Sequence, residues 1–465
     1  MTKKIWYEGL SEEDVIKYAI NTLIRRIDAV LNNSQYINLP NTNPYEQLMM
    51  LAPNKVLTIN SLLDYYDFLV KIKNIIIGYT YNTWLPEVKK ALMNNNYKID
   101  PQNFIRLGRK SFYIRFVENK KLKDLKVLIR LEKTKNASVS IALELSRISI
   151  NVEIKDQIHL DYNIAKDILL GLLSSDGGRY GSNFVITNNE IEIHVLTAAL
   201  IKAIAQSKNI SRILLRLSLN RLSVTNDGKL GISIETYFNN SLIGFNFKNK
   251  LDALKTWLNG KLDVNLMATL TGFYLGDGFI DSNKRRTGFT MSIIVDGQLG
   301  TKLLADTLKH IGYTLMDFNF KRSANAIWLT KDSTYKFAWD LLNFVSQLED
   351  PRVRFTILNH YRVRKTIHIA FNNYNSHEIW IIYNKYNFKL MHHRSGYYCL
   401  VANTHDKARM LNLFLKEMIE ISNKFKVYLK THIIGEKLQE LVINRDSLPT
   451  FIALVNLLCQ VKIKN

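Results

Sequence analysis

Two short stretches of the sequence are nearly equivalent: LLGLLSSDG at residues 169–177 and LTGFYLGDG at residues 270–278. In each stretch glycine follows leucine by two positions, a small residue follows that glycine by four, and the last two residues are Asp-Gly. Small residues four apart lie on one face of a helix and form a flat strip. Glycine inside a helix costs about 1 kcal/mol relative to alanine, so its recurrence indicates a close helix–helix interface. The predicted interface residues are Gly171, Ser175, Gly272 and Gly276.

Each stretch also places an aspartate at the end of its helix. Asp176 and Asp277 precede Gly177 and Gly278, and glycine is favoured just after a helix C-terminus. A carboxylate at the negative end of the helix dipole is disfavoured, and parallel pairing of the helices adds repulsion between the two carboxylates. A divalent cation relieves both effects. Magnesium suits the position because it accepts carboxylate oxygens and completes its shell with water and phosphate.

The sequence therefore predicts a metal site at one end of a helix pair. Its predicted members are Asp176, Asp277, Gly177 and Gly278, and the expected cofactor is Mg²⁺ or another divalent cation. A metal centre of this kind supports phosphodiester hydrolysis. We expect the two aspartates to be the catalytic residues.

The two aspartates lie 101 residues apart (277 − 176), which is one period of a repeat. The first half is predicted as residues 157–260 and the second as 261–350. The elements expected in the first half are a helix at 161–175, strands at 184–188 (FVITN) and 191–195 (IEIHV), a helix at 197–207, a two-strand hairpin and a helix near 250–258. The same order recurs in the second half. Two αββαββα units with antiparallel sheets place the chain in the α+β class.

The regions outside the repeat have their own patterns. Residues 1–108 show helical spacing of apolar residues, and residues 109–156 alternate with a period of two, which predicts a small separate antiparallel sheet. Residues 365–465 predict a C-terminal α/β domain, which is either a degenerate further copy of the repeat or an unrelated domain.

The composition points to a polyanionic partner. Among 465 residues, 63 Lys and Arg face 41 Asp and Glu, which gives a net charge of +22. Such an excess suits nucleic acid, because each cation that meets a phosphate releases a condensed counterion; a solubilising basic surface is the alternative. We expect no membrane span, because no long apolar run occurs. Since no secretory signal is found at the start of the sequence, an intracellular location, cytoplasmic or nucleoid-associated, is expected.

The paired motifs resemble the LAGLIDADG motif of the LAGLIDADG homing endonucleases, in their single-chain, two-motif form. The resemblance covers about residues 155–350, and the second stretch matches more closely than the first. It implies that the two helices form the interface between halves and that Asp176 and Asp277 bind the metal. It also implies an antiparallel saddle over the major groove of DNA. The N-terminal and C-terminal regions exceed the minimal domain of that family.

Several strands carry long polar side chains on one face, as expected for such a saddle. In residues 212–220, for example, the polar residues alternate with Ile213, Leu215, Leu217 and Leu219. The predicted DNA contacts are Arg212, Arg216, Asn220, Lys229, Lys284, Arg285, Arg286, Thr290, Asn319, Lys321 and Arg322. An ordinary half-solvated sheet gives the same alternation.

These observations predict a site-specific, metal-dependent endonuclease that acts on double-stranded DNA. Three alternatives remain: a non-cleaving DNA-binding regulator or chromatin factor on the same scaffold, an RNA-binding intron maturase, and a structural or partner-binding protein. We expect a monomer and an asymmetric DNA site, because the two halves differ in sequence.

Overall fold

The computed structural model describes most of the chain. The described residues are 7, 9–100, 111–117, 119–131, 139–146, 148–259, 264–281, 288–292, 297–316, 326–371, 377–392, 397–424, 431–434 and 439–464. Within them the protein is a mixed α+β structure built on antiparallel sheets, as predicted.

The first half of the repeat has the predicted order of helix, two strands, helix, two strands, helix. Its elements are α5 (Tyr162–Ser175), β7 (Gly177–Tyr180), β8 (Asn183–Asn188), α6 (Ile191–Ser207), β9 (Leu214–Val224), β10 (Leu230–Asn239) and α7 (Lys250–Leu258). The strands are antiparallel in the spatial order β7-β8-β10-β9. Alternate residues of β9 and β10 are buried, so one face of the sheet packs on helices and the other is polar.

One predicted strand of this half is wrong. The segment IEIHV is the first turn of α6, and the true partner of β8 is the short strand β7 in GGRY. Residues 193–205 of α6 are all buried. Because apolar residues then occur on every side of the helix, five alternating residues carry no reliable period.

The described part of the second half follows this order with one strand fewer. Its described elements are α8 (Leu266–Asp277), β11 (Gly278–Asp281), β12 (Gly288–Ser292), α9 (Gly297–His310), β13 (Ala326–Leu329) and α10 (Lys331–Gln347). The strands pair as β11-β12-β13, and Leu315 bridges to Leu329 beyond β13. The described parts of the two halves therefore follow the same order of helices and strands, as the duplicated unit predicts.

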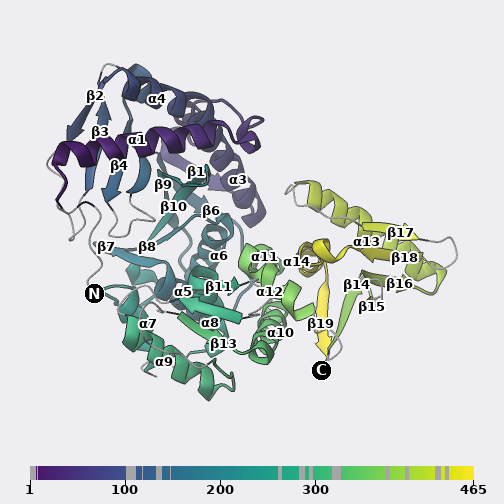
Figure 1. The fold of residues 1–465 in the computed structure, drawn as a ribbon. Helices are drawn as coiled ribbons and strands as arrows, with labels where there is room; N and C mark the ends of the chain where they lie inside the picture. The colour runs from purple at the N-terminus through teal and green to yellow at the C-terminus, as the bar shows by residue number, and fades with distance from the viewer. Residues whose placement is uncertain are drawn as a thin grey trace.

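The N-terminal region supplies four α-helices and six strands to the described fold. They are α1 (Glu12–Leu31), α2 (Pro44–Leu51), β1 (Val56–Ile59), α3 (Leu62–Tyr79), α4 (Leu85–Met93), β2 (Tyr97–Asp100), β3 (Ser111–Phe116), β4 (Leu125–Leu131), β5 (Val139–Leu145) and β6 (Ser149–Ile154). Figure 1 shows α1, α3 and α4 gathered with these strands at one end of the molecule.

The prediction of a small separate sheet for residues 109–156 is wrong. Strands β2, β3, β4 and β5 continue one sheet with the first half, because β5 pairs with β9 through Ala142–Ser223 and Glu144–Arg221. Strand β6 pairs with the other end of β9, and β1 joins β6 in parallel. Strand β9 is long enough to hold both partners. The alternating pattern predicts strands but not their partners, which here lie about 80 residues away (223 − 142 = 81).

The C-terminal region begins with two helices and continues into a six-stranded sheet. Its elements are α11 (Pro351–Asn359), α12 (Tyr361–Phe371), β14 (Glu378–Tyr383), β15 (Tyr386–His392), β16 (Tyr398–Ala402), α13 (His405–Lys424), β17 (Thr431–Ile434), β18 (Gln439–Ile443), α14 (Leu448–Leu458) and β19 (Gln460–Lys464). Figure 1 shows β14 to β18 with α13 as a lobe beside α10, α11 and α12.

Part of the C-terminal sheet has the topology of the repeat. Its order β15-β16-β18-β17, with α13 between the hairpins and α14 after them, is the order of β7-β8-β10-β9 with α6 and α7. Strand β14 precedes β15, where the repeat has a helix that ends in aspartate. The shared order favours the interpretation of this region as a third copy without an acidic helix end.

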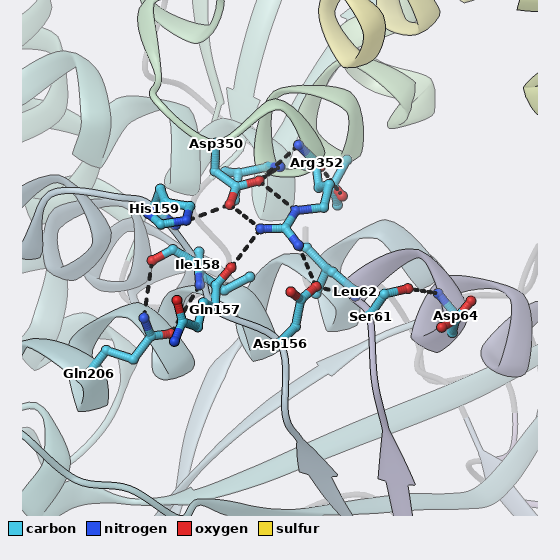
Figure 2. A network of polar contacts seen from close by, with 12 residues as sticks. Ser61, Leu62, Asp64, Asp156, Gln157, Ile158, His159, Gln206, Asp350 and Arg352 are labelled. Carbon is cyan, nitrogen blue, oxygen red and sulfur yellow. Dashed lines mark hydrogen bonds and ion pairs between the residues drawn. The ribbon is translucent and has the colours of Figure 1, made fainter. Parts of the chain in front are cut away.

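A polar network fastens three regions of the chain together (Figure 2). Arg352, in the first turn of α11, makes an ion pair with Asp350 at 2.6 Å and a second one with Asp156, which follows β6. Asp156 also accepts a hydrogen bond from the backbone N–H of Leu62 at 2.8 Å, and Asp350 accepts one from that of His159 at 3.1 Å. The network therefore joins α3, the start of the first half and the end of the second half.

The helices in the described part of the chain do not include one that is both long and apolar enough to span a membrane.

Candidate functional site

Helices α5 and α8 cross at their glycines. A Cβ atom built on Gly171 would lie 2.6 Å from the backbone nitrogen of Phe273, and one built on Gly272 would lie 3.0 Å from that of Leu172. Phe273 and Leu172 are 101 residues apart, as are the two glycines, so the contacts are reciprocal. The helices therefore lie parallel about a pseudo-two-fold axis, with backbones too close for any side chain at either glycine.

The ends of the two helices meet in the same way. Gly276 faces Ser175, and a Cβ atom at Gly276 would lie 2.7 Å from Oδ2 of Asp176. Asp176 is the C-cap of α5, and Asp277 is the last residue of α8 and is 9% exposed. The structure thus brings together all the predicted interface residues and places both aspartates at helix C-termini.

The two glycines after the aspartates differ from the expected helix stop. Gly278 has φ −70° and ψ 146°, and neither glycine is among the described glycines with positive φ. Each instead starts a strand: Gly177 pairs with Ile186 and Gly278 with Met291. A Cβ atom at Gly177 would overlap the backbone of Leu173, so a close approach, not a left-handed turn, requires these glycines.

Burial dominates the electrostatics of the acidic pair. It raises the pKa of Asp277 to about 7, and the neighbouring Asp176 carboxylate adds to this rise while Lys250 and Arg362 oppose it. Burial also raises the pKa of Asp176, against the hydrogen bond from Asn188 and the charges of Arg362 and Lys250. Simultaneous ionisation of the two carboxyl groups is therefore disfavoured.

Two basic residues stand at the two helix ends, and the sequence analysis missed both. Lys250 Nζ donates to the backbone carbonyl of Ser175 at 2.9 Å, at the end of α5. Arg362 Nη1 donates to the carbonyl of Gly276 at 2.6 Å, at the end of α8, and also to that of Leu275. Cations at a helix C-terminus stabilise the negative end of the dipole.

These two cations change the charge argument made from the sequence. Two negative helix ends with two carboxylates are matched by one lysine and one arginine, so a bound cation is no longer required for charge balance. Lys250 begins α7 and looks in the sequence like any solvated first-turn lysine. Arg362 belongs to α12, outside the region of resemblance. Only the tertiary structure brings them to the pair.

Asn188 fixes the orientation of Asp176. Its Nδ2 donates to Asp176 Oδ2 at 2.6 Å, and its backbone carbonyl lies 3.1 Å from Nε2 of the fully buried His194. The Nδ1 atom of His194 lies 2.8 Å from the hydroxyl of Thr236. Because burial lowers the pKa of His194 to about 4, this histidine is neutral and serves the core.

The acidic pair supplies two candidate ligands for a metal ion. Across the described ranges, no group of three or more His, Cys, Asp or Glu side chains is placed to hold a metal ion. Two carboxylates are nevertheless a donor set that magnesium accepts, since it keeps several waters and takes phosphate oxygens. Asp176 and Asp277 fit that requirement.

The predicted DNA contacts of the first half lie on or beside the polar face of the sheet. Arg216 of β9 is exposed and lies over the ring of Tyr237 of β10, 5.6 Å from its centroid. Arg212 precedes β9 and makes an ion pair with Glu153 at 3.4 Å. Lys229 makes an ion pair with Asp227 in the hairpin turn at 2.6 Å.

A β-bulge shifts the faces of β9 near its middle. The pairing with β10 slips between Ser218–Glu235 and Arg221–Ser233, so Leu219 and Leu222 are both buried. Asn220 is half-buried and donates to the Ser218 hydroxyl. Arg221, which strict alternation excludes, therefore joins the polar face, and the sequence analysis did not include it there.

The predicted contacts of the second half are mostly outside the described residues. Those are Lys284, Arg285, Arg286, Asn319, Lys321 and Arg322. Thr290 lies in β12, opposite Phe279 of β11 and Trp328 of β13.

Comparisons with known proteins add little. No protein-family model matches the chain, and no curated protein matches its sequence. A solved structure with a similar arrangement is the crystal structure of the N-terminal LAGLIDADG domain of DUF199/WhiA. It covers 39% of this chain and 83% of that chain at 11% identity, with a TM-score of 0.24. Both the identity and the TM-score are low, and the fold described above is defined by its own strand pairing.

Proposed function

We propose that this protein binds double-stranded DNA across the polar faces of the sheets that follow Asp176 and Asp277, on a LAGLIDADG-like scaffold. The observation that carries the proposal is the reciprocal packing of α5 and α8 about a pseudo-two-fold axis. It sets two sheets of one topology on either side of the axis, and paired half-sites on duplex DNA have matching symmetry.

The chemistry of the first sheet supports the same partner. A major groove admits a two-stranded antiparallel ribbon, and β9 with β10 is such a ribbon, with Arg216, Arg221 and Tyr237 on its polar face. The net charge of +22 supplies the long-range attraction to phosphate. An RNA duplex is a poorer partner, because its major groove is too narrow for a ribbon.

A second candidate function is metal-dependent cleavage of the bound DNA. The adjacent carboxylates of Asp176 and Asp277, with Asp277 at a pKa of about 7, favour it, because perturbed carboxyl groups gather at catalytic sites. A bound magnesium ion would supply electrostatic stabilisation of charge at the phosphate. Asp176 and Asp277 would hold it, Asn188 would orient Asp176, and Lys250 and Arg362 would offset charge on the nearby oxygens.

Binding is tested with random-sequence duplex DNA, measured by fluorescence anisotropy over a salt series. We expect binding whose logarithm falls linearly with the logarithm of salt concentration. In the variant Arg212→Gln/Arg216→Gln we expect the slope of log affinity against log salt concentration to be smaller in magnitude by roughly 2. The matched control, Lys17→Gln/Arg25→Gln, removes the same charges from exposed positions of α1 and leaves it nearly unchanged. Equal affinity for duplex RNA, or no binding to DNA, contradicts the proposal.

Cleavage is tested on a random-sequence duplex library with and without magnesium. If the protein is a nuclease, wild type cuts only with magnesium, Asp277→Asn binds without cutting, and the exposed control Asp332→Asn cuts like wild type. Binding without cutting by all three proteins rejects the nuclease and leaves a DNA-binding protein.

A further inference from the structure

A row of mostly charged side chains crosses the sheet from the N-terminal strands to the first half of the repeat. In the strand registers each member of the row lies directly opposite the next, from β2 through β3, β4, β5 and β9 to β10. The row is Lys98, Arg115, Lys126, Glu144, Arg221 and Ser233. Four of its six members are basic and one is acidic.

All six lie on the same face as Arg216, because directly opposed residues share a face of a sheet. Neighbours on the strands, such as Val127 and Leu143, are buried on the other face under the N-terminal helices. Helix α1 covers that other face, where Arg26 donates to the backbone carbonyls of Val139 and Val224. The polar face is therefore continuous from the first half of the repeat into the N-terminal region.

This face is hollowed where the row crosses it. A cavity of about 740 Å³ lies between β3, β4, β5, β9 and β10. Its charged lining comprises Arg115, Lys123, Asp124, Lys126, Glu144, Arg221 and Glu235. The Oδ1 atom of Asn220, which also lines it, is buried without a hydrogen-bond partner.

Glu144 holds two of the basic residues in place over the hollow. Its carboxylate makes ion pairs with Arg221 at 2.6 Å and Lys126 at 3.3 Å, whose side chains remain 42% and 40% exposed. Arg115 is 61% exposed, although it pairs with Asp100 at 3.0 Å. Lys123 is exposed as well. These cations remain accessible to an anion that arrives from solvent.

We infer that strands β2 to β5 extend the DNA-binding face, and that the hollow lined by Arg115, Lys123, Lys126 and Arg221 receives the phosphate backbone of the duplex that flanks the first half of the site. The inference rests on the proposed function. The three steps from β9 to β3 span about 14 Å at the spacing of neighbouring strands. That distance is about four base pairs of duplex DNA, so the footprint is longer on the side of the first half.

The inference is tested with random-sequence duplexes of increasing length, whose affinity rises until the DNA fills the binding face. The variant Arg115→Gln/Lys123→Gln changes two exposed side chains, and Lys17→Gln/Arg25→Gln is its control on the opposite face. We expect the affinity of the first variant to reach its plateau with a duplex about four base pairs shorter than wild type needs. We also expect its slope of log affinity against log salt concentration to be smaller in magnitude by roughly 2. The control keeps the wild-type plateau and salt dependence. Thermal unfolding checks that both variants are folded.

The outcomes separate the inference from the function. If wild type binds DNA but Arg115→Gln/Lys123→Gln behaves like the control, the N-terminal strands do not contact DNA and the inference alone fails. If wild type does not bind duplex DNA, the proposed function fails and the inference fails with it.

Discussion

At the scale of single residues, Asp277 is a buried acid in a position that disfavours its charge. It lies at the negative end of α8, is 9% exposed and faces the Asp176 carboxylate. Proteins keep such a group where it has a task or where neighbouring cations offset its cost. Here Lys250 and Arg362 lower the cost but do not remove it, since the pKa of Asp277 is still raised to about 7.

This raised pKa predicts how stability depends on pH. Between the ordinary value of 3.8 and about 7 the folded protein keeps a proton on Asp277 that the unfolded chain has lost. The stabilising contribution of the protonated Asp277 to the free energy of unfolding is therefore full below about pH 4, and it is lost as the pH rises to about 7. We expect Asp277→Asn to remove this slope and to raise the free energy of unfolding above pH 7 by roughly 2–4 kcal/mol.

The measurement is urea unfolding of both proteins over this pH range in the absence of divalent ions. The exposed Asp332→Asn serves as the control and keeps the wild-type slope. Parallel pH profiles for wild type and Asp277→Asn would show that Asp277 ionises as easily in the folded protein as in the unfolded chain.

At the scale of elements, the pairing of α5 with α8 holds the two halves together. Most residues of both helices are buried, and Gly171 and Gly272 let the backbones touch. Such contact forgoes side-chain burial at the crossing point but gains dispersion between closely packed backbone atoms. It also fixes the register that puts Asp176 beside Asp277.

A methyl group at the crossing point should therefore be costly. We expect Gly171→Ala to lower the free energy of unfolding by about 3 kcal/mol, because the new Cβ meets backbone atoms of α8 that cannot move aside. Gly178→Ala is the control, since its Cβ meets a side-chain carbon of Val185 at 3.1 Å and a backbone atom, the Val185 oxygen, only at 4.0 Å. Chemical denaturation measures both, and equal effects would mean that the helices do not pack through their glycines.

At the scale of the whole molecule, the N-terminal region, the repeat and the C-terminal region are tied together by a few long-range polar links. Arg352 is the centre of the most extensive one (Figure 2), and its partner Asp350 is fully buried. A second link joins Tyr66 of α3, Glu192 of α6 and Asn359 of α11, with hydrogen bonds of 3.0 to 3.1 Å.

Breaking the Arg352 network leaves a buried carboxylate without its cation. We expect Arg352→Met to lower the free energy of unfolding by about 3 kcal/mol, and to expose the segment around His159 to earlier hydrogen exchange. Lys229→Met, which removes an ion pair on a hairpin turn, is the control and leaves stability unchanged. Hydrogen exchange followed by mass spectrometry measures the stability and the local exchange of both variants. Unaltered stability of Arg352→Met would mean that the three regions are held together by apolar packing alone.

Several elements of this fold could be predicted from local sequence. The two motifs lie 101 residues apart and have small residues at equivalent positions. They predict that α5 and α8 pack in parallel, with an aspartate at the C-terminal end of each helix. The alternation in β9 predicts its two faces until the bulge. The strand prediction for IEIHV fails because a helix buried on all sides has no apolar period.

The duplicated α+β unit and the position of Asp176 and Asp277 follow from the sequence, because the strip of small residues on a helix and the end of a helix are specified by residues close together in the chain. The tertiary structure alone decided the surroundings of those aspartates. Lys250 reaches the pair from 75 residues beyond Ser175 and Arg362 from 86 residues beyond Gly276. It also decided that β5 pairs with β9, because alternation specifies that a strand has a buried face but not which strand lies beside it.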